Sequence, residues 1–179
     1  MAKKLEGKRI LMAIAKENFR DEELLTPKRI FGEEGAVVAV ASNERGTCKG
    51  MLGAEATAEL AIRDAKADDY DALVIPGGLG SPEYLWRNGD LHALIKAFRE
   101  KGKQTHSICL SPAVLAITGV LKGRKAAVYA TPESKAELEK GGAVYVDEPV
   151  VVDGDVVTGR DPDAAEPFAR KIVEVLGKK

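Results

Sequence analysis

The chain has 179 residues, of which 45% are hydrophobic and 31% charged, and its 27 Lys+Arg residues nearly balance its 28 Asp+Glu residues. This composition predicts a soluble globular protein, in the cytoplasm, with a single domain over residues 1–179. The balanced charge argues against nucleic acid as a partner, and the apolar runs are too short to cross a membrane. Two cysteines, Cys48 and Cys109, are too few for a disulfide framework or a zinc site, so we expect no metal and no cofactor.

Short apolar runs alternate with amphipathic segments along the chain, and each apolar run is typical of a buried strand. In chain order the strands are expected at 9–15, 36–41, 72–76, just before Cys109, at 125–129 and 143–146, and in a hairpin over 150–157. Helices are expected after a cap at Asp21, over 91–100, after Cys109, and over 133–140 and 167–176. Residues 43–53 are expected to form a loop, and 55–62 fit either a strand or a helix. The alternation predicts an α/β fold, a doubly wound and mostly parallel sheet with helices on both faces.

Cys109 lies at the turn between a predicted strand and a helix that begins with a proline, in the run Thr105-His106-Ser107-Ile108-Cys109-Leu110-Ser111-Pro112. A thiol at this turn faces the positive end of the helix, which favours the reactive thiolate. The alternative is that Cys109 is only a small buried hydrophobic residue.

Three loops with suggestive residues leave the carboxyl ends of predicted strands, where ligands bind in such sheets. They carry Glu17, the pair Gly77-Gly78, and Cys109 itself. We expect Glu17 to lie against Cys109 as a protonated carboxyl that donates to sulfur and shuttles a proton. The backbone N–H groups of Gly78 and Leu110 are expected to form an oxyanion hole. The alternatives are that Glu17 is a solvated loop residue and that the two glycines only form a turn.

The two histidines are better explained as structural residues. His92 falls next to the apolar face of a predicted helix, and His106 is three residues before Cys109 on the same strand. Strand alternation points His106 to the opposite face, so neither histidine is a good candidate base.

These segments, in this order, resemble the superfamily of PfpI-type intracellular proteases and parkinsonism-associated protein deglycases. The resemblance covers nearly the whole chain. Its specific parts are Ile75-Pro76-Gly77-Gly78 and Ile108-Cys109, in this order and spacing. The resemblance also includes the acidic residue that follows the first strand and the segment Val157-Thr158-Gly159-Arg160.

The resemblance implies a flavodoxin-like domain that is a dimer or larger homo-oligomer, with the elbow cysteine as reactive centre and a protonated glutamate as its partner. Counting forward from the first strand gives Glu17 for that role, and counting back from Asp21 gives Asn18. We prefer Glu17 because only a carboxyl can hold a proton beside the thiol and donate it. Gly77, Thr131 and Arg160 are secondary candidates for the site.

The residue after Cys109 separates the branches of this superfamily. The protease-like members carry a histidine there, and this chain has Leu110. The segment therefore looks more like the deglycase and redox-sensor branch. Some members of that branch place a histidine just before a later proline, where this chain has Thr131, which weakens the case for strong glyoxalase activity.

Three functions remain in competition. The first is a thiol enzyme for reactive carbonyls, in which Cys109 forms a hemithioacetal and Glu17 shuttles the proton. The second is a redox sensor or chaperone without turnover, in which an oxidant acts on Cys109. The third is a cysteine peptidase or amidotransferase-like hydrolase that takes its base from another subunit.

Overall fold

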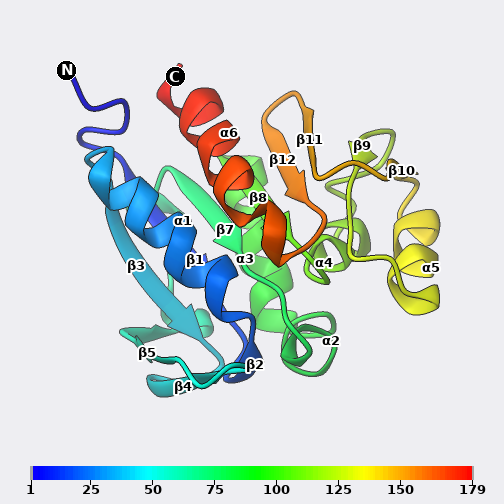
Figure 1. The fold of residues 1–179 in the computed structure, drawn as a ribbon, viewed down its shortest axis with the longest axis horizontal. Helices are drawn as coiled ribbons and strands as arrows, with labels where there is room; N and C mark the ends of the chain where they lie inside the picture. Colours follow the sequence, from blue (N-terminus) through cyan, green and yellow to red (C-terminus); the bar gives the residue numbers. More distant parts are fainter. Residues whose placement is uncertain (1, 179) are drawn as a thin grey trace.

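The computed structural model describes residues 2–178, so the ends of the predicted unit, Met1 and Lys179, lie outside the described residues. Its centre is a 7-stranded sheet in the order β11-β12-β8-β7-β1-β3-β6 (Figure 1). These strands are β1 (Arg9–Ala13), β3 (Val37–Ser42), β6 (Leu60–Ala61), β7 (Ala72–Ile75), β8 (Gln104–Ile108), β11 (Val150–Asp153) and β12 (Val156–Gly159). All neighbours are parallel except β11 and β12, which form the antiparallel hairpin predicted at Asp153-Gly154. The predicted α/β, flavodoxin-like sheet is confirmed.

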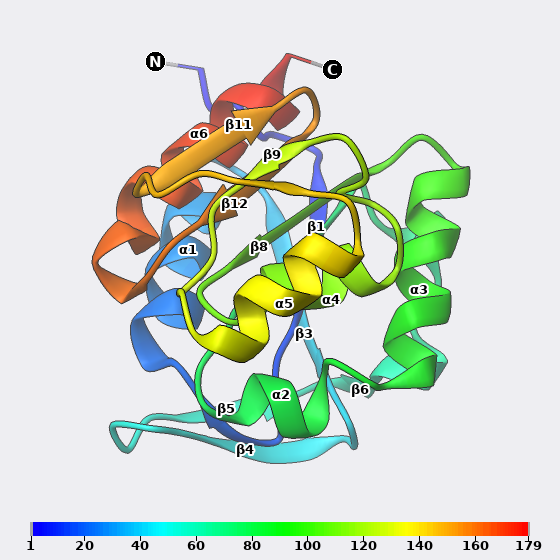
Figure 2. The ribbon, with the colours of Figure 1, turned by 90° about the vertical axis from the view of Figure 1, so that its right-hand side faces the viewer.

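Helices cover both faces of this sheet. On one face, α1 (Asp21–Glu33) packs against α6 (Ala165–Gly177), as Figure 1 shows. On the other face, α3 (Gly89–Glu100) and α4 (Pro112–Ile117) pack against β8, and α5 (Pro132–Lys140) packs against α4 (Figure 2). Both faces of β7 and β8 are buried, which is why their sequences do not alternate between apolar and exposed polar residues. No helix of the described residues is long and apolar enough to span a bilayer.

The prediction of a loop over 43–53 is wrong. Strand β4 (Gly46–Gly50) pairs with β5 (Glu55–Ala58) and with β2 (Glu17–Phe19) in a small separate sheet. The predicted cap residue Asp21 is instead the first residue of α1, and its carboxylate accepts hydrogen bonds of 2.9 and 2.8 Å from the N–H groups of Leu52 and Ala54. A short acidic side chain suits a helix cap and a turn equally well, and here it closes the β4–β5 turn and ties it to the start of α1.

The strand predicted over 125–129 is shorter than expected. Only β9 (Lys125–Ala126) is a strand, and it pairs with β10 (Val144–Tyr145) in a 2-stranded sheet. The next N–H groups leave the strand ladder, because that of Ala127 donates to the Thr158 hydroxyl and that of Tyr129 donates to the Cys109 carbonyl. This departure brings Tyr129 beside the turn that carries Cys109. The remaining helical segments are α2 (Gly80–Tyr84), η1 (Ile62–Asp64), η2 (Ala67–Asp69) and η3 (Pro162–Ala164).

Candidate functional site

Cys109 is held at the carboxyl end of β8 in a strained backbone conformation. Its φ is 67°, in the left-handed region that residues with a Cβ seldom adopt. Its N–H donates to the Gly159 carbonyl at 2.9 Å, and its carbonyl accepts from the Tyr129 N–H at 2.7 Å. The side chain is 6% exposed. The predicted sharp turn is thus present, and bonds to β12 and to the segment after β9 hold it.

The carboxyl beside Cys109 belongs to Glu23, in the first turn of α1, and not to Glu17. Glu23 has no exposed surface, and its Oε1 accepts a 2.8 Å hydrogen bond from the Gly77 N–H. Its other oxygen, Oε2, is buried and has no hydrogen-bond partner of ordinary geometry among the described residues. The carboxyl nevertheless interacts with the Cys109 thiol closely enough for each to shift the other's pKa. Glu23 therefore takes the place that the sequence analysis gave to Glu17.

The path of the chain explains why Glu17 is elsewhere. Glu17 lies in β2, half-buried, in register with Lys49 of β4. Its backbone packs so closely on Gly80 that a Cβ there would come 1.9 Å from the Glu17 carbonyl oxygen. The alternative candidate, Asn18, has an exposed side chain and a φ of 59°, and its carbonyl lies against Gly78. Glu17 and Asn18 shape the loop through their backbones, and the helix that follows supplies the acid.

Burial raises the pKa of Glu23 to about 8, against the opposing hydrogen bond from Gly77. Burial also raises the pKa of Cys109, and the charge of an ionised Glu23 raises it further. This is the opposite of the direction predicted from the turn alone, because α4 is only six residues long and burial outweighs its dipole. Near neutral pH Glu23 is therefore protonated. Because Glu23 and Cys109 interact, the loss of the first proton near pH 8 belongs to the two groups together.

Two backbone N–H groups point at the Cys109 sulfur, and they are those of Gly78 and Leu110. Both hydrogen bonds act to lower the thiol pKa. Gly78 has a φ of 108°, and a Cβ on it would come 2.4 Å from the backbone nitrogen of Arg20 and 2.4 Å from the backbone oxygen of Asn18. Only glycine fits there. The predicted donor pair is thus placed at the sulfur, while its role towards an oxyanion stays a prediction.

Buried hydroxyls connect the two loops that carry these donors. The Ser111 hydroxyl donates to the Pro76 carbonyl at 2.7 Å and lies 2.8 Å from the Ser81 hydroxyl. The N–H of Ser81 donates to the Gly78 carbonyl at 3.0 Å. On the other side, the indole N–H of Trp86 donates to the Leu110 carbonyl at 2.9 Å. The serine pair therefore fixes the Gly78 loop relative to the Cys109 turn.

A pocket of about 150 Å³ opens above the sulfur. Its lining residues are Arg20, Met51, Gly78, Leu79, Cys109, Leu110, Tyr129 and Pro162. No local sequence pattern points to Arg20, Met51, Tyr129 or Pro162, because each comes from a segment whose approach depends on tertiary structure. The pocket gives the thiol a route to small molecules.

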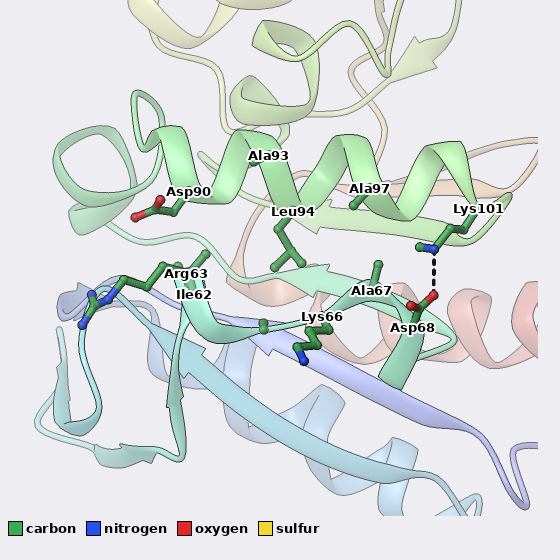
Figure 3. Close-up of a pocket in the computed structure, with 11 residues that line it drawn as sticks. Ile62, Arg63, Lys66, Ala67, Asp68, Asp90, Ala93, Leu94, Ala97 and Lys101 are labelled. Carbon is green, nitrogen blue, oxygen red and sulfur yellow. Dashed lines mark ion pairs between the residues drawn. The ribbon is translucent and has the colours of Figure 1, made fainter.

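A second hollow, of about 240 Å³, lies between α3 and the η1–η2 segment (Figure 3). Asp90 and Lys101 mark the two ends of α3 there, and Lys101 pairs with Asp68 at 2.7 Å. The lining includes neither a cysteine nor a histidine. The Cys109 pocket is therefore the stronger candidate site.

The secondary candidates have other partners. Gly77 belongs to the site through its N–H bond to Glu23. Thr131 caps α5, accepting from the Ser134 N–H at 3.0 Å. Arg160 pairs with Asp161 at 3.0 Å and with Asp147 at 3.2 Å.

Both histidines are engaged away from the thiol within this chain. His106 is fully buried, with Nε2 at 2.9 Å from the Gln104 side-chain oxygen and Nδ1 accepting from the Val157 N–H at 2.9 Å. Burial lowers its pKa to about 3, so it is neutral. His92 forms a hydrogen bond of 2.7 Å between its Nε2 and the Trp86 carbonyl oxygen. Residues 2–178 contain no cluster of His, Cys, Asp or Glu suited to a metal ion.

Comparison with known proteins gives a consistent picture. Residues 8–175 match the DJ-1/PfpI family. An uncharacterized protein of Methanocaldococcus jannaschii is 48% identical over 97% of this chain and 85% of its own length. A protein of Thermococcus kodakarensis named as a deglycase is 37% identical over 93% of this chain and 98% of its own. A ThiJ/PfpI domain protein of Brachyspira murdochii superposes with a TM-score of 0.91, at 29% identity, over 97% of this chain and 99% of its own. The chain therefore belongs to the DJ-1/PfpI family.

Proposed function

We propose that the protein is a thiol enzyme for small reactive carbonyl compounds, with Cys109 as nucleophile and Glu23 as proton shuttle. The observation that carries this proposal is the buried Glu23 carboxyl at the thiol, with two N–H donors aimed at the same sulfur below an open pocket. Relatives that are named deglycases support the class of chemistry.

The first step is the addition of sulfur to an aldehyde. In the reactive form of the pair, the proton is on Glu23 and the charge on sulfur. The S–C bond forms as the C=O π bond breaks, and the oxygen takes the Glu23 proton, which leaves a hemithioacetal and an ionised Glu23. The Gly78 and Leu110 N–H groups are placed to stabilise the oxygen as charge develops on it.

With a 2-oxoaldehyde, the same carboxyl can complete the reaction. The ionised Glu23 removes the proton from the carbon bonded to sulfur; a C=C bond forms, the π electrons of the neighbouring C=O move to its oxygen, and an enediolate results. The hydroxyl proton of the hemithioacetal passes to that oxygen, and return of the Glu23 proton to the second carbon gives a thioester, which water hydrolyses to a 2-hydroxy acid and the free thiol. Neither histidine is needed, because one carboxyl carries the proton in every step.

The test compares turnover of methylglyoxal by Glu23→Gln and Glu17→Gln, both in a Cys48→Ser background. We expect Glu23→Gln to lose at least about 100-fold in kcat, the usual contribution of a positioned acid–base group. Glu17→Gln should keep the activity of the background protein. If Glu23→Gln stayed within tenfold of the background while Cys109→Ser was inactive, the shuttle role would be wrong.

A second candidate function is sensing of oxidants without turnover. It is favoured by the Oε2 atom of Glu23, which is buried without a hydrogen-bond partner and could donate to a sulfinate on Cys109. Peroxide should then oxidise Cys109 before Cys48, which is 1% exposed and lines no pocket described here. Mass spectrometry of peptides after limited peroxide treatment measures that order, and prior oxidation of Cys48 would contradict the sensor role.

A peptidase role has less support, because both histidines of this chain are bonded elsewhere. A base from a partner subunit would still require the homo-oligomer that we propose from the resemblance. Light scattering of the purified protein measures the oligomeric state. A monomer at micromolar concentration would exclude a shared site.

A further inference from the structure

We propose that the Cys109 pocket selects small carbonyl compounds that carry a carboxylate or phosphate group, and that Arg20 is the residue that selects them. This inference rests on the proposed reaction and names its substrate class. Among the lining residues, Arg20 is the charged one; the side chains of Met51, Leu79, Tyr129 and Pro162 add an apolar wall. Such a lining orients a ligand that is polar at two ends.

The Arg20 side chain is fixed by a salt bridge to Glu22 that leaves part of its guanidinium available to a ligand. Its Nε and Nη2 donate to the two carboxylate oxygens of Glu22 at 2.9 and 3.0 Å, which leaves Nη1 for a ligand. The side chain is 26% exposed, so it is ordered by this pair and still accessible from the pocket. A guanidinium presents several N–H donors in a plane, which suits carboxylate and phosphate oxygens.

The charges around the sulfur favour an anion in this place. An ionised Cys109 is among the groups that raise the pKa of the Arg20 guanidinium, so the guanidinium is near enough to attract a negative charge at the sulfur. Glu23 is protonated at neutral pH, since its pKa lies at about 8, and so does not repel a ligand. Glu22 is ionised, because its hydrogen bond to Arg20 lowers its pKa, and it competes with the ligand for Arg20. Removing the Glu22 charge should therefore strengthen the preference.

The size of the pocket limits the substrate. At about 150 Å³ it holds the volume of roughly five water molecules, which suits a compound of a few heavy atoms. The carbonyl oxygen would lie at the Gly78 and Leu110 N–H groups and the anionic group at Arg20. Addition then proceeds as above, with the S–C bond formed at the carbonyl carbon and the proton supplied by Glu23.

Iodoacetate and iodoacetamide test this preference without any turnover, because they differ mainly in the charge of a small group. The measured quantity is the ratio of their alkylation rates at Cys109 in the Cys48→Ser background, divided by the same ratio for a free thiol. Both reagents need the same thiolate, so a change in thiol pKa cancels in the ratio. Arg63→Gln is the matched control, since Arg63 also pairs with a glutamate, Glu44, at 2.9 Å.

We expect Arg20→Gln to lower the iodoacetate preference by about threefold to tenfold, the effect of one charge a few ångströms away in a partly solvated site. Glu22→Gln should raise the preference, and Arg63→Gln should leave it unchanged. An unchanged ratio in Arg20→Gln, or an equal change in Arg63→Gln, would overturn the proposal. A ratio that follows Arg20, with no turnover of either methylglyoxal or a 2-oxoaldehyde that carries a carboxylate, would refute the proposed reaction and leave the anion preference standing.

Discussion

Two buried polar groups at strand β8, His106 within it and Cys109 at its carboxyl end, differ in backbone strain and in their access to a pocket. At His106, both ring nitrogens have partners, on Gln104 and Val157, and no described pocket reaches the ring. At Cys109, one oxygen of the adjacent Glu23 has no ordinary partner, the backbone is strained, and a pocket leads to the sulfur. Burial shifts a pKa in both clusters, so a shifted pKa by itself does not identify a reactive site. The pocket that leads to the Cys109 sulfur and the strained backbone beside it distinguish this cluster from His106.

The two clusters should also respond to pH with opposite signs. The pKa of Glu23 is raised from 4.5 to about 8, so the stability it contributes is present below pH 4.5 and is lost as pH rises to about 8. The pKa of His106 is lowered from 6.5 to about 3, so its contribution is present above pH 6.5 and is lost as pH falls towards 3. Substituting Glu23 or His106 removes one of these two pH dependences.

The largest effect is expected from Glu23→Gln. Glutamine can still accept from the Gly77 N–H and never ionises in the buried site. Relative to the native protein, we expect this variant to gain about 4 kcal/mol in the free energy of unfolding between pH 5 and pH 8, from a shift of a few pKa units. Urea denaturation across this pH range measures the difference. A constant difference between the two proteins would show that Glu23 is already ionised in the folded state at pH 5.

His106→Asn should show the opposite dependence. The asparagine oxygen can replace Nδ1 as acceptor for the Val157 N–H, while the bond to Gln104 and the volume of the ring are lost. We expect a loss of about 1–3 kcal/mol at pH 7, together with a stability curve that is flatter than that of the native protein between pH 6.5 and pH 4. Thermal unfolding at several pH values gives the curve. The rate of Cys109 alkylation should not change, and a tenfold change would mean that the two clusters are coupled.

Much of the fold could be predicted from the sequence because it follows from local patterns. The buried runs at 9–15, 72–76 and before Cys109 gave the central strands, and Asp153-Gly154 gave the hairpin. The strand β4 was missed because three glycines within 43–53 favoured a loop, although its partner β5 follows directly along the chain. The short β9 could not be predicted, since its partner β10 lies 19 residues away. The same holds for Asp21, whose partners lie 31 and 33 residues away.

The geometry of the candidate site was predictable at Cys109, Gly78 and Leu110, where the strand ends fix the backbone, but the position of the neighbouring carboxyl was not. A signal for Glu23 was present in the sequence. Glu23 shares the inner stripe of α1 with Pro27, Ile30 and Phe31, which are all buried. A charged residue in the apolar stripe of a helix is an exception that needs a partner. Side chains in a helix lean towards its first turn, which lets Glu23 reach back to the sheet edge.

The smallest effect is expected from Ser111→Ala, which tests whether the Cys109 cluster depends on the buried hydroxyls of Ser111 and Ser81. The change removes the donor to the Pro76 carbonyl and leaves the Ser81 hydroxyl without this partner, so we expect a loss of about 1–2 kcal/mol in stability. Because these bonds fix the Gly78 loop against the Cys109 turn, alkylation should slow by about threefold while its pH dependence stays the same. Ser42→Ala is the control, since it removes a 2.7 Å hydrogen bond from another buried hydroxyl, to the Ile14 carbonyl, at a similar cost of about 1–2 kcal/mol, and this bond involves neither loop. If both variants slowed alkylation equally, the effect would come from lower stability and not from the positions of the Gly78 and Leu110 donors.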